Sequence, residues 1–256
     1  MKAPLTVTFL ILCMTSSCRT TSSRSAPKAF VTDAQAKEAF KIIKGIDYLP
    51  FDYPKEGCFA RAYFMAMELA AQGIPSSSQY LARMQGRLMF GEIEWKWHVA
   101  PALLIVEDPA TGKQRDVYKY QEVNKGNIEQ VTEEVTIVDP AMSSEPMSVK
   151  KWFGLMLEDD TNAYALIAPG NFYDAAVPPL IGPRPEVIKS FAELGKFKLS
   201  HVRRSCGVLT KFLFEDEARK KKVSARAEAL VTKLEAMGKL ERDIPSMDFA
   251  CPFVGW

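Results

Sequence analysis

Apolar and polar positions alternate along the chain in patterns that predict three helices in its first two thirds. Residues 31–45 carry apolar positions at helical spacing, with Thr32 and Gln35 placed as a capping box and Gly45 at the end. Residues 57–73, GCFARAYFMAMELAAQG, are apolar and rich in alanine, which predicts a helix that begins beside a glycine-marked loop. Residues 144–157 predict a further helix.

Three other segments have the composition of β-strands. Residues 95–108, WKWHVAPALLIVED, are rich in aromatic and β-branched residues, and Pro101 within them indicates an edge strand or a bulge. Residues 133–142 predict a strand that ends at Asp139, because the following proline cannot continue a central strand. Residues 162–169 predict a short strand or extended segment.

The last third of the chain predicts a surface crossover and a long helix. The proline-rich residues 177–185 are typical of a surface crossover. After them, five apolar residues repeat at helical spacing and predict an amphipathic helix: Val223, Ala227, Leu230, Leu234 and Met237. The basic run at residues 219–222 is interpreted as a solvated helix face rather than a membrane or nucleic-acid patch.

The N-terminus predicts export. Residues 1–18 combine a lysine, a short apolar run and small residues, which is typical of a signal peptide, and residues 19–30 form a polar tether. Ser16, Ser17 and Cys18 are similar to the end of a lipobox, although Thr15 stands where leucine is usual, so lipidation of Cys18 and ordinary cleavage nearby both stay open. We therefore expect a periplasmic or outer-membrane lipoprotein, or a secreted protein, whose single domain spans residues 31–256 and ends in a helical part.

Charge and motifs exclude several classes of function. A net charge of +2 with 25% charged residues gives no electrostatic footprint for nucleic acid. The chain contains no HExxH, no paired CxxC and no glycine-rich nucleotide motif, so neither a metal site nor a cofactor is expected.

Cysteine chemistry is the remaining candidate. Cys58 stands at the predicted start of a helix, where free backbone N–H groups favour a thiolate over a thiol. Only two histidines are present, and His98 lies in a predicted strand, whereas His201 has no comparable context. Cys58, His98 and Asp139 could form a triad of nucleophile, base and orienting carboxylate. The alternative is that all three are ordinary core or turn residues.

The segments around these residues resemble a known family. The run FDYPKEGCFARAYFMAMEL is similar to the nucleophile segment of bacterial protein-glutaminases, and WHVAP and IVDPAM are similar to that family's histidine and aspartate segments. The resemblance covers roughly residues 47–175. It implies an α+β fold with a papain/transglutaminase-like core, in which the nucleophile helix packs on an antiparallel sheet. Tyr63 departs from it, since a histidine is expected there.

The resemblance also implies an activity. Cys58 is the expected nucleophile, His98 the general acid and base, and Asp139 the residue that orients His98, in an enzyme that deamidates glutamine side chains through a thioester. The expected partners are proteins or peptides with exposed glutamine, and we expect a monomer. A transglutaminase, a cysteine peptidase and a non-catalytic envelope lipoprotein remain as alternatives.

The cysteines that follow the leader are odd in number. They are Cys58, Cys206 and Cys251. We expect a disulfide between Cys206 and Cys251 and a reduced Cys58, because an odd count in an exported chain leaves one free thiol. Two unpaired core cysteines are the alternative.

Overall fold

The computed structural model describes residues 30–53, 55–105, 120–131, 135–171, 196–213 and 216–244. The predicted signal peptide, most of the tether, the proline-rich crossover, Cys18 and Cys251 lie outside the described residues. None of the helices in the described ranges is both long enough and apolar enough to cross a membrane.

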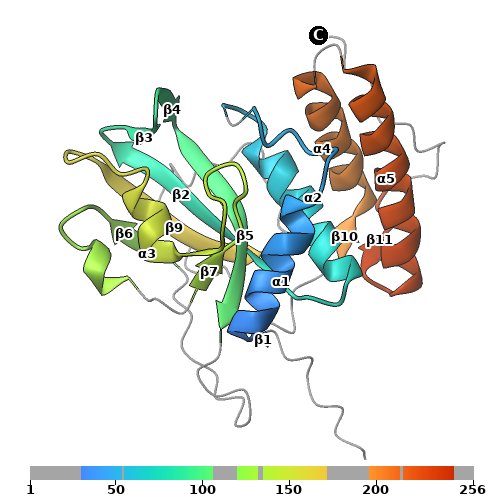
Figure 1. Ribbon diagram of the computed structural model, residues 1–256, viewed down its shortest axis with the longest axis horizontal. Helices are drawn as coiled ribbons and strands as arrows, with labels where there is room; N and C mark the ends of the chain where they lie inside the picture. The colour runs from blue at the N-terminus through green and yellow to red at the C-terminus, as the bar shows by residue number, and fades with distance from the viewer. Residues whose placement is uncertain are drawn as a thin grey trace, which may run out of the picture.

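A curled, mainly antiparallel sheet forms the centre of the molecule (Figure 1). Its strands, in spatial order, are β6 (Tyr120–Val123), β9 (Asn162–Pro169), β2 (Ser77–Gln85), β5 (Trp97–Ile105), β7 (Val135–Ile137) and β8 (Met147–Ser148). The short strand β1 (Phe30–Val31) pairs in parallel with the end of β5. Two further pairs lie outside this sheet: β3 (Leu88–Phe90) with β4 (Ile93–Trp95), and β10 (Phe197–Lys198) with β11 (Leu240–Glu241).

Helices cover the sheet unequally. Four gather together on one side: α1 (Asp33–Lys44), α2 (Cys58–Ala71), α4 (Leu199–Phe212) and α5 (Glu217–Ala236), seen on the right in Figure 1. The shorter α3 (Val149–Gly154) and the 3-10 turn at Ile128–Gln130 lie at the other side. The architecture is therefore α+β with a helix packed on an antiparallel sheet, and this part of the prediction is confirmed.

Strand alternation divides the core into two apolar clusters. Along β5, Val99 and Leu103 pack with the helices α1, α2, α4 and α5, whereas Ala100 and Ala102 pack with Trp152 of α3. Successive side chains of a strand point to opposite faces, so β5 contributes to both clusters. His98 lies in register with Ala100 and Ala102 and therefore belongs to the α3 side of the sheet.

Two helices agree well with the sequence prediction and a third is shorter. In α1 the capping box between Thr32 and Gln35 is formed in both directions, and α5 includes the predicted apolar stripe from Val223 to Leu234. The helix predicted at 144–157 is reduced to α3, capped by the Ser148 hydroxyl on the N–H of Lys151. Pro146 disfavours helix in the residue before it, and residues 147–148 pair with β7 instead.

The prediction that Pro101 marks an edge strand or a bulge is wrong. β5 lies between β2 and β7, and its pairing with β2 runs through Pro101 without a register shift. The Pro101 carbonyl accepts from the N–H of Val138, just where β7 has ended. In an antiparallel pair the nitrogen and carbonyl of one residue face the same neighbour. The nitrogen of Pro101, which carries no hydrogen, therefore faces the segment that follows β7. No hydrogen bond between two paired strands is lost there.

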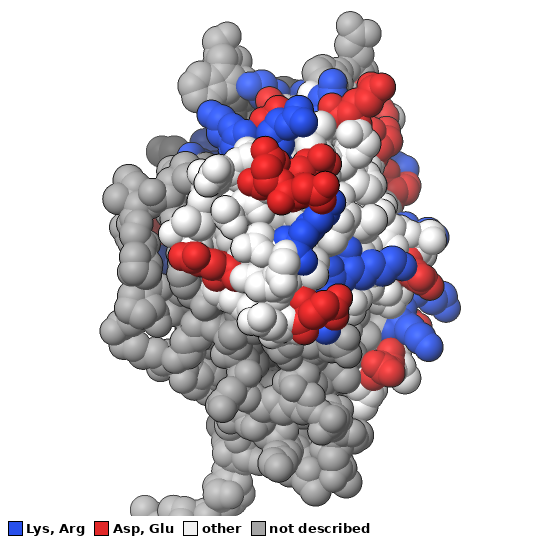
Figure 2. Space-filling model, turned by 90° about the vertical axis from the view of Figure 1, so that its left-hand side faces the viewer, with Lys and Arg blue, Asp and Glu red and all other residues white. Residues whose placement is uncertain are grey.

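Charged side chains on the outer surface are interspersed. On the face shown in Figure 2, lysine and arginine alternate with aspartate and glutamate. Ion pairs of opposite charge include Arg83 with Glu94 at 2.6 Å and Lys125 with Asp159 at 2.7 Å. Both pairs are accessible to solvent, so they contribute little to stability.

Candidate active site

Cys58 is the first residue of α2, directly after a glycine in the left-handed region. Gly57 has φ 70°, and no side chain caps the helix there. A Cβ at this position would lie 2.8 Å from the Phe212 ring of α4. Glycine is required both by the backbone conformation and by this close approach. Gly57 has no side chain to cap the first N–H groups of α2, which have no acceptor within the helix.

His98 and Asp139 are brought together by adjacent strands. His98 lies in β5 and Asp139 follows β7, and the two strands pair with Ala102 opposite Ile137. Continuing this register places Asp139 near Ala100, on the same face as His98. The Nε2 of His98 and the Oδ2 of Asp139 are 2.9 Å apart, and the two side chains are 2% and 4% exposed. Residues 41 positions apart in sequence thus share one buried hydrogen bond.

Two tryptophans enclose this pair. The ring of Trp95 is stacked on that of His98, with centroids 4.3 Å apart. Trp152 of α3 donates from Nε1 to the Oδ2 of Asp139 at 3.0 Å. The sequence motifs assign no role to either tryptophan. Trp95 stands three residues before His98, but nothing in the sequence places Trp152 beside Asp139, because that contact depends on how α3 packs on the sheet.

The pair stabilises its own charges. Burial alone would lower the pKa of His98, but the charge and hydrogen bond of Asp139, together with the Cys58 sulfur, raise it to about 9. Burial would raise the pKa of Asp139, yet the charge of His98 and the hydrogen bonds from His98 and Trp152 hold it below its usual value. At neutral pH the imidazole is therefore protonated and the carboxyl is ionised, so Nε2–H donates to Oδ2.

The second ring nitrogen of His98 is available to Cys58. Nδ1 is buried and has no hydrogen-bond partner of regular geometry among the described residues. Cys58 is 7% exposed as a whole residue and is close enough to contribute to the raised pKa of His98. Both a hydrogen bond and a charge interaction with Cys58 contribute to the raised pKa of His98. All three predicted site residues lie in one buried region.

The other histidine, His201, lies on α4 and packs against Tyr63 of α2. The ring of His201 packs edge-on against that of Tyr63, with centroids 6.0 Å apart. The Tyr63 hydroxyl accepts from the backbone N–H of Lys198 at 3.0 Å. Tyr63 is 2% exposed. The position where the family resemblance led us to expect histidine thus connects α2 to the start of α4.

The cysteines differ in their state. Cys58 is a free thiol, and Cys206 of α4 is disulfide-bonded. Its expected partner, Cys251, lies outside the described residues, so the pairing stays a prediction. No cluster of three or more potential metal ligands occurs in the part of the chain that the structure describes.

Solved structures similar to this chain include protein-glutaminases. A crystal structure of protein-glutaminase is 21% identical, with a TM-score of 0.45, and the alignment covers 72% of this chain and 88% of that chain. The NMR structure of protein-glutaminase from Chryseobacterium proteolyticum is 21% identical, with a TM-score of 0.44 and coverages of 73% and 90%. No curated protein sequence matches the chain.

A sequence family matches the part of the chain that carries two of the three site residues. Residues 34–114 match the family described as glutaminase. This range includes Cys58 and His98, and Asp139 lies beyond its end. The match confirms the resemblance to the glutaminase family that the sequence motifs predicted.

Proposed function

We propose that this protein is a cysteine-dependent amide hydrolase that converts glutamine side chains of proteins or peptides to glutamate and releases ammonia. The assignment is supported by the glutaminase match over residues 34–114. Its chemistry rests on one observation: a buried imidazole that is bonded at Nε2 to Asp139 and has its unpartnered Nδ1 near a free cysteine at a helix start.

In the first half of the reaction, the Cys58 thiolate attacks the side-chain carbonyl carbon of glutamine. The C–S bond forms as the carbonyl π electrons move to oxygen. The amide nitrogen takes a proton from His98, the C–N bond breaks and ammonia leaves. The products are a thioester on Cys58 and a neutral imidazole.

In the second half, the neutral His98 removes a proton from water. The resulting hydroxide equivalent attacks the thioester carbon, the C–S bond breaks and glutamate forms. The thiolate and the imidazolium are restored. Asp139 holds the ring in one orientation throughout and stabilises the imidazolium whenever it is present, which is the role its 2.9 Å hydrogen bond suits.

The start of α2 supplies stabilisation for the oxyanion. Its first backbone N–H groups have no intrahelical partner, and Gly57 offers no side chain to cap them. A carbonyl oxygen held there would meet these donors and the positive end of the helix dipole. A single preorganised donor of this kind is typically worth about 10²-fold to 10³-fold in rate.

The test is ammonia release from a glutamine-containing protein such as casein and from a short blocked glutamine peptide, combined with mass spectrometry. Hydrolysis adds one dalton per glutamine. We expect activity in the wild type and its loss in Cys58→Ala and His98→Ala, with His201→Ala as the matched control that keeps activity. Absence of ammonia and of the mass change with both substrates would contradict the proposal.

The same assay separates the alternatives. A transglutaminase would release ammonia but form isopeptide crosslinks when lysine is present. A peptidase would create new amino termini, and a non-catalytic lipoprotein would do none of these. We further propose that the protein acts outside the cytoplasm, as a monomer on exposed glutamine residues. Cell fractionation with and without Cys18→Ala tests the location and the anchor.

A further inference from the structure

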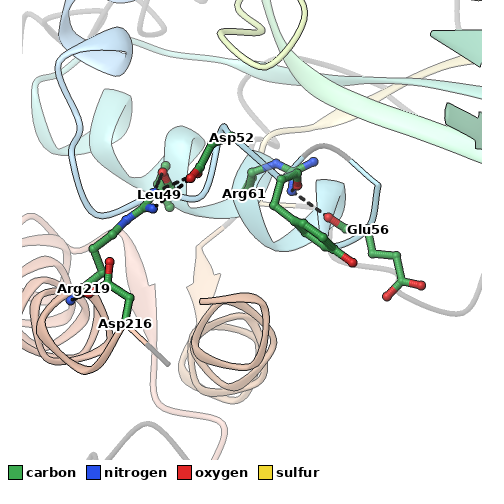
Figure 3. A network of polar contacts seen from close by, with 7 residues as sticks. Leu49, Asp52, Glu56, Arg61, Asp216 and Arg219 are labelled. Atoms are coloured by element: carbon green, nitrogen blue, oxygen red, sulfur yellow. Dashed lines mark hydrogen bonds and ion pairs between the residues drawn. The ribbon is translucent and has the colours of Figure 1, made fainter. Parts of the chain in front are cut away.

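Arg61 is a buried arginine one turn after Cys58 on α2. It is 2% exposed. Its Nη1 donates to two backbone carbonyls of the segment that leads into Cys58, those of Tyr53 at 2.8 Å and Glu56 at 2.6 Å (Figure 3). This segment, residues 49–53 and 55–57, is here called the approach loop. Arg61 thus connects the helix that carries the nucleophile to the loop that precedes it.

The surroundings of Arg61 are anionic. Burial lowers the pKa of its guanidinium, whereas the charges of Cys58, Asp139 and Asp52 act to raise it. Arginine remains a cation under such conditions. Two of these three groups are members of the proposed triad, so Arg61 interacts electrostatically with the reacting groups while it holds the loop.

The charges of the buried site balance only when Arg61 is included. With Cys58 as the thiolate nucleophile of the proposed reaction, Cys58 and Asp139 are negative, and His98 and Arg61 are positive. In the thioester intermediate the thiolate charge is gone and the His98 proton has left with ammonia. The remaining charges are the negative charge of Asp139 and the positive charge of Arg61, which balance each other. Without Arg61, both states would contain one uncompensated negative charge in a buried region, which is costly.

We propose that Arg61 is a positioning residue that supplies the fixed positive charge of the active site, keeping it neutral in both halves of the reaction while holding the approach loop against α2. This inference rests on the proposed role of Cys58 as nucleophile. It assigns to Arg61 an electrostatic effect on the thiolate beyond its hydrogen bonds to backbone.

A second arginine holds the other end of the same loop and provides the matched control. Arg219 of α5 donates to the Leu49 carbonyl at 2.7 Å and pairs with Asp52 at 3.2 Å (Figure 3). The basic run at residues 219–222 was predicted to be a solvated helix face. This is only part of its role, because Arg219 and Lys222 also contact the segment before α2. Arg219 tethers the loop as Arg61 does, but it does so from α5 and not from the helix that carries Cys58.

The experiment measures alkylation of Cys58 by iodoacetamide from pH 5 to 10, read from the mass of the peptide that contains it. The proteins are the wild type, Arg61→Gln, Arg61→Lys and Arg219→Gln. We expect Arg61→Gln to move the half-maximal rate upward by about one pH unit, which is about a tenfold slower reaction at neutral pH. Arg61→Lys and Arg219→Gln should keep the profile within a few tenths of a unit.

Three outcomes would overturn the proposal. They are an unchanged profile in Arg61→Gln, an equal shift in Arg219→Gln, and a shift of a full unit in a folded Arg61→Lys. Near-UV circular dichroism checks folding, and if Arg61→Gln does not fold, a full-unit shift in a folded Arg61→Lys would still overturn the proposal. No substrate is used, so a wild type that shows the expected profile but releases no ammonia would contradict the proposed function and leave the role of Arg61 standing.

Discussion

The indole of Trp95 lies almost parallel to the imidazole of His98, with 4.3 Å between ring centroids and 8° between planes. An aromatic face attracts a cation placed over it, and His98 is protonated at neutral pH because its pKa is about 9. The stack therefore stabilises the imidazolium as well as packing it. Trp95 also donates from Nε1 to the Lys55 carbonyl at 3.1 Å, which connects the histidine to the approach loop.

We expect Trp95→Leu to lower the pKa of His98 and to reduce kcat/KM by about tenfold, the effect of losing roughly 1–2 kcal/mol of cation–π stabilisation. Trp95→Phe is the matched control, because it also loses the indole N–H but keeps an aromatic face. NMR titration of the His98 ring and ammonia release measure the two effects. Equal pKa values of His98 in both variants would show that the ring face contributes nothing.

Asp139→Asn should lower the pKa of His98 toward or below 6.5, because both the charge and the ionic hydrogen bond are lost. Activity should fall by at least about 10²-fold, since the ring loses its orientation and its counter-charge. The pH profile of kcat/KM in the wild type should decline above about pH 9, when His98 loses the proton that ammonia needs. A decline that begins near pH 7 would contradict this assignment.

Stability should depend on pH through the same pair. His98 has a raised pKa in the folded state, so its contribution is complete below 6.5 and is lost as pH rises through about 9. Asp139 has a lowered pKa, so its contribution is present above 3.8 and is lost in acid. Urea unfolding should show that the free energy of unfolding falls by about 3 kcal/mol between pH 6.5 and 9. In Asp139→Asn the slope of this free energy against pH should be smaller. Equal slopes in the two proteins would exclude the pair as its cause.

Trp152→Phe removes the N–H that Asp139 accepts at 3.0 Å while keeping a ring in the core. We expect the pKa of Asp139 to rise and kcat to fall by about tenfold, in line with about 1.5 kcal/mol for a hydrogen bond to a charged group. Trp97→Phe is the matched control. Trp97 lies next to His98 on β5 but packs on the opposite face, against Phe59 and Tyr80. Equal activity losses in the two variants would indicate a general packing effect.

Gly57→Ala should destabilise the protein and lower its activity together. The left-handed backbone costs about 1 kcal/mol for alanine, and the added Cβ meets the Phe212 ring at 2.8 Å. Gly73→Ala separates the two costs, because Gly73 has φ 77° with nothing within 4 Å of an added Cβ. Thermal unfolding should show the larger loss for Gly57→Ala, and a loss equal to that of Gly73→Ala would mean that Phe212 moves freely aside.

The family resemblance and the fold class followed from local sequence. A capping box, an apolar helix after Gly57 and two aliphatic strands are written in neighbouring residues, so the sequence placed α1, α2, β5 and β9 near their observed positions. The prediction for residues 144–157 was too long, because β8 competes for two residues that helical spacing alone assigned to a helix. Such competition depends on pairing with β7, a strand outside the segment predicted to be helical.

What the sequence by itself determined is which groups can react: a cysteine at a helix start, one histidine in a strand and one aspartate where a strand stops. Only the tertiary structure decided what surrounds them. Trp152, Arg61 and Arg219 are ordinary helix residues in sequence, and they reach Asp139, Tyr53 and Leu49 because packing brings distant segments together. Periodicity reports which face a residue occupies, whereas the partner on that face is set by the arrangement of the whole fold.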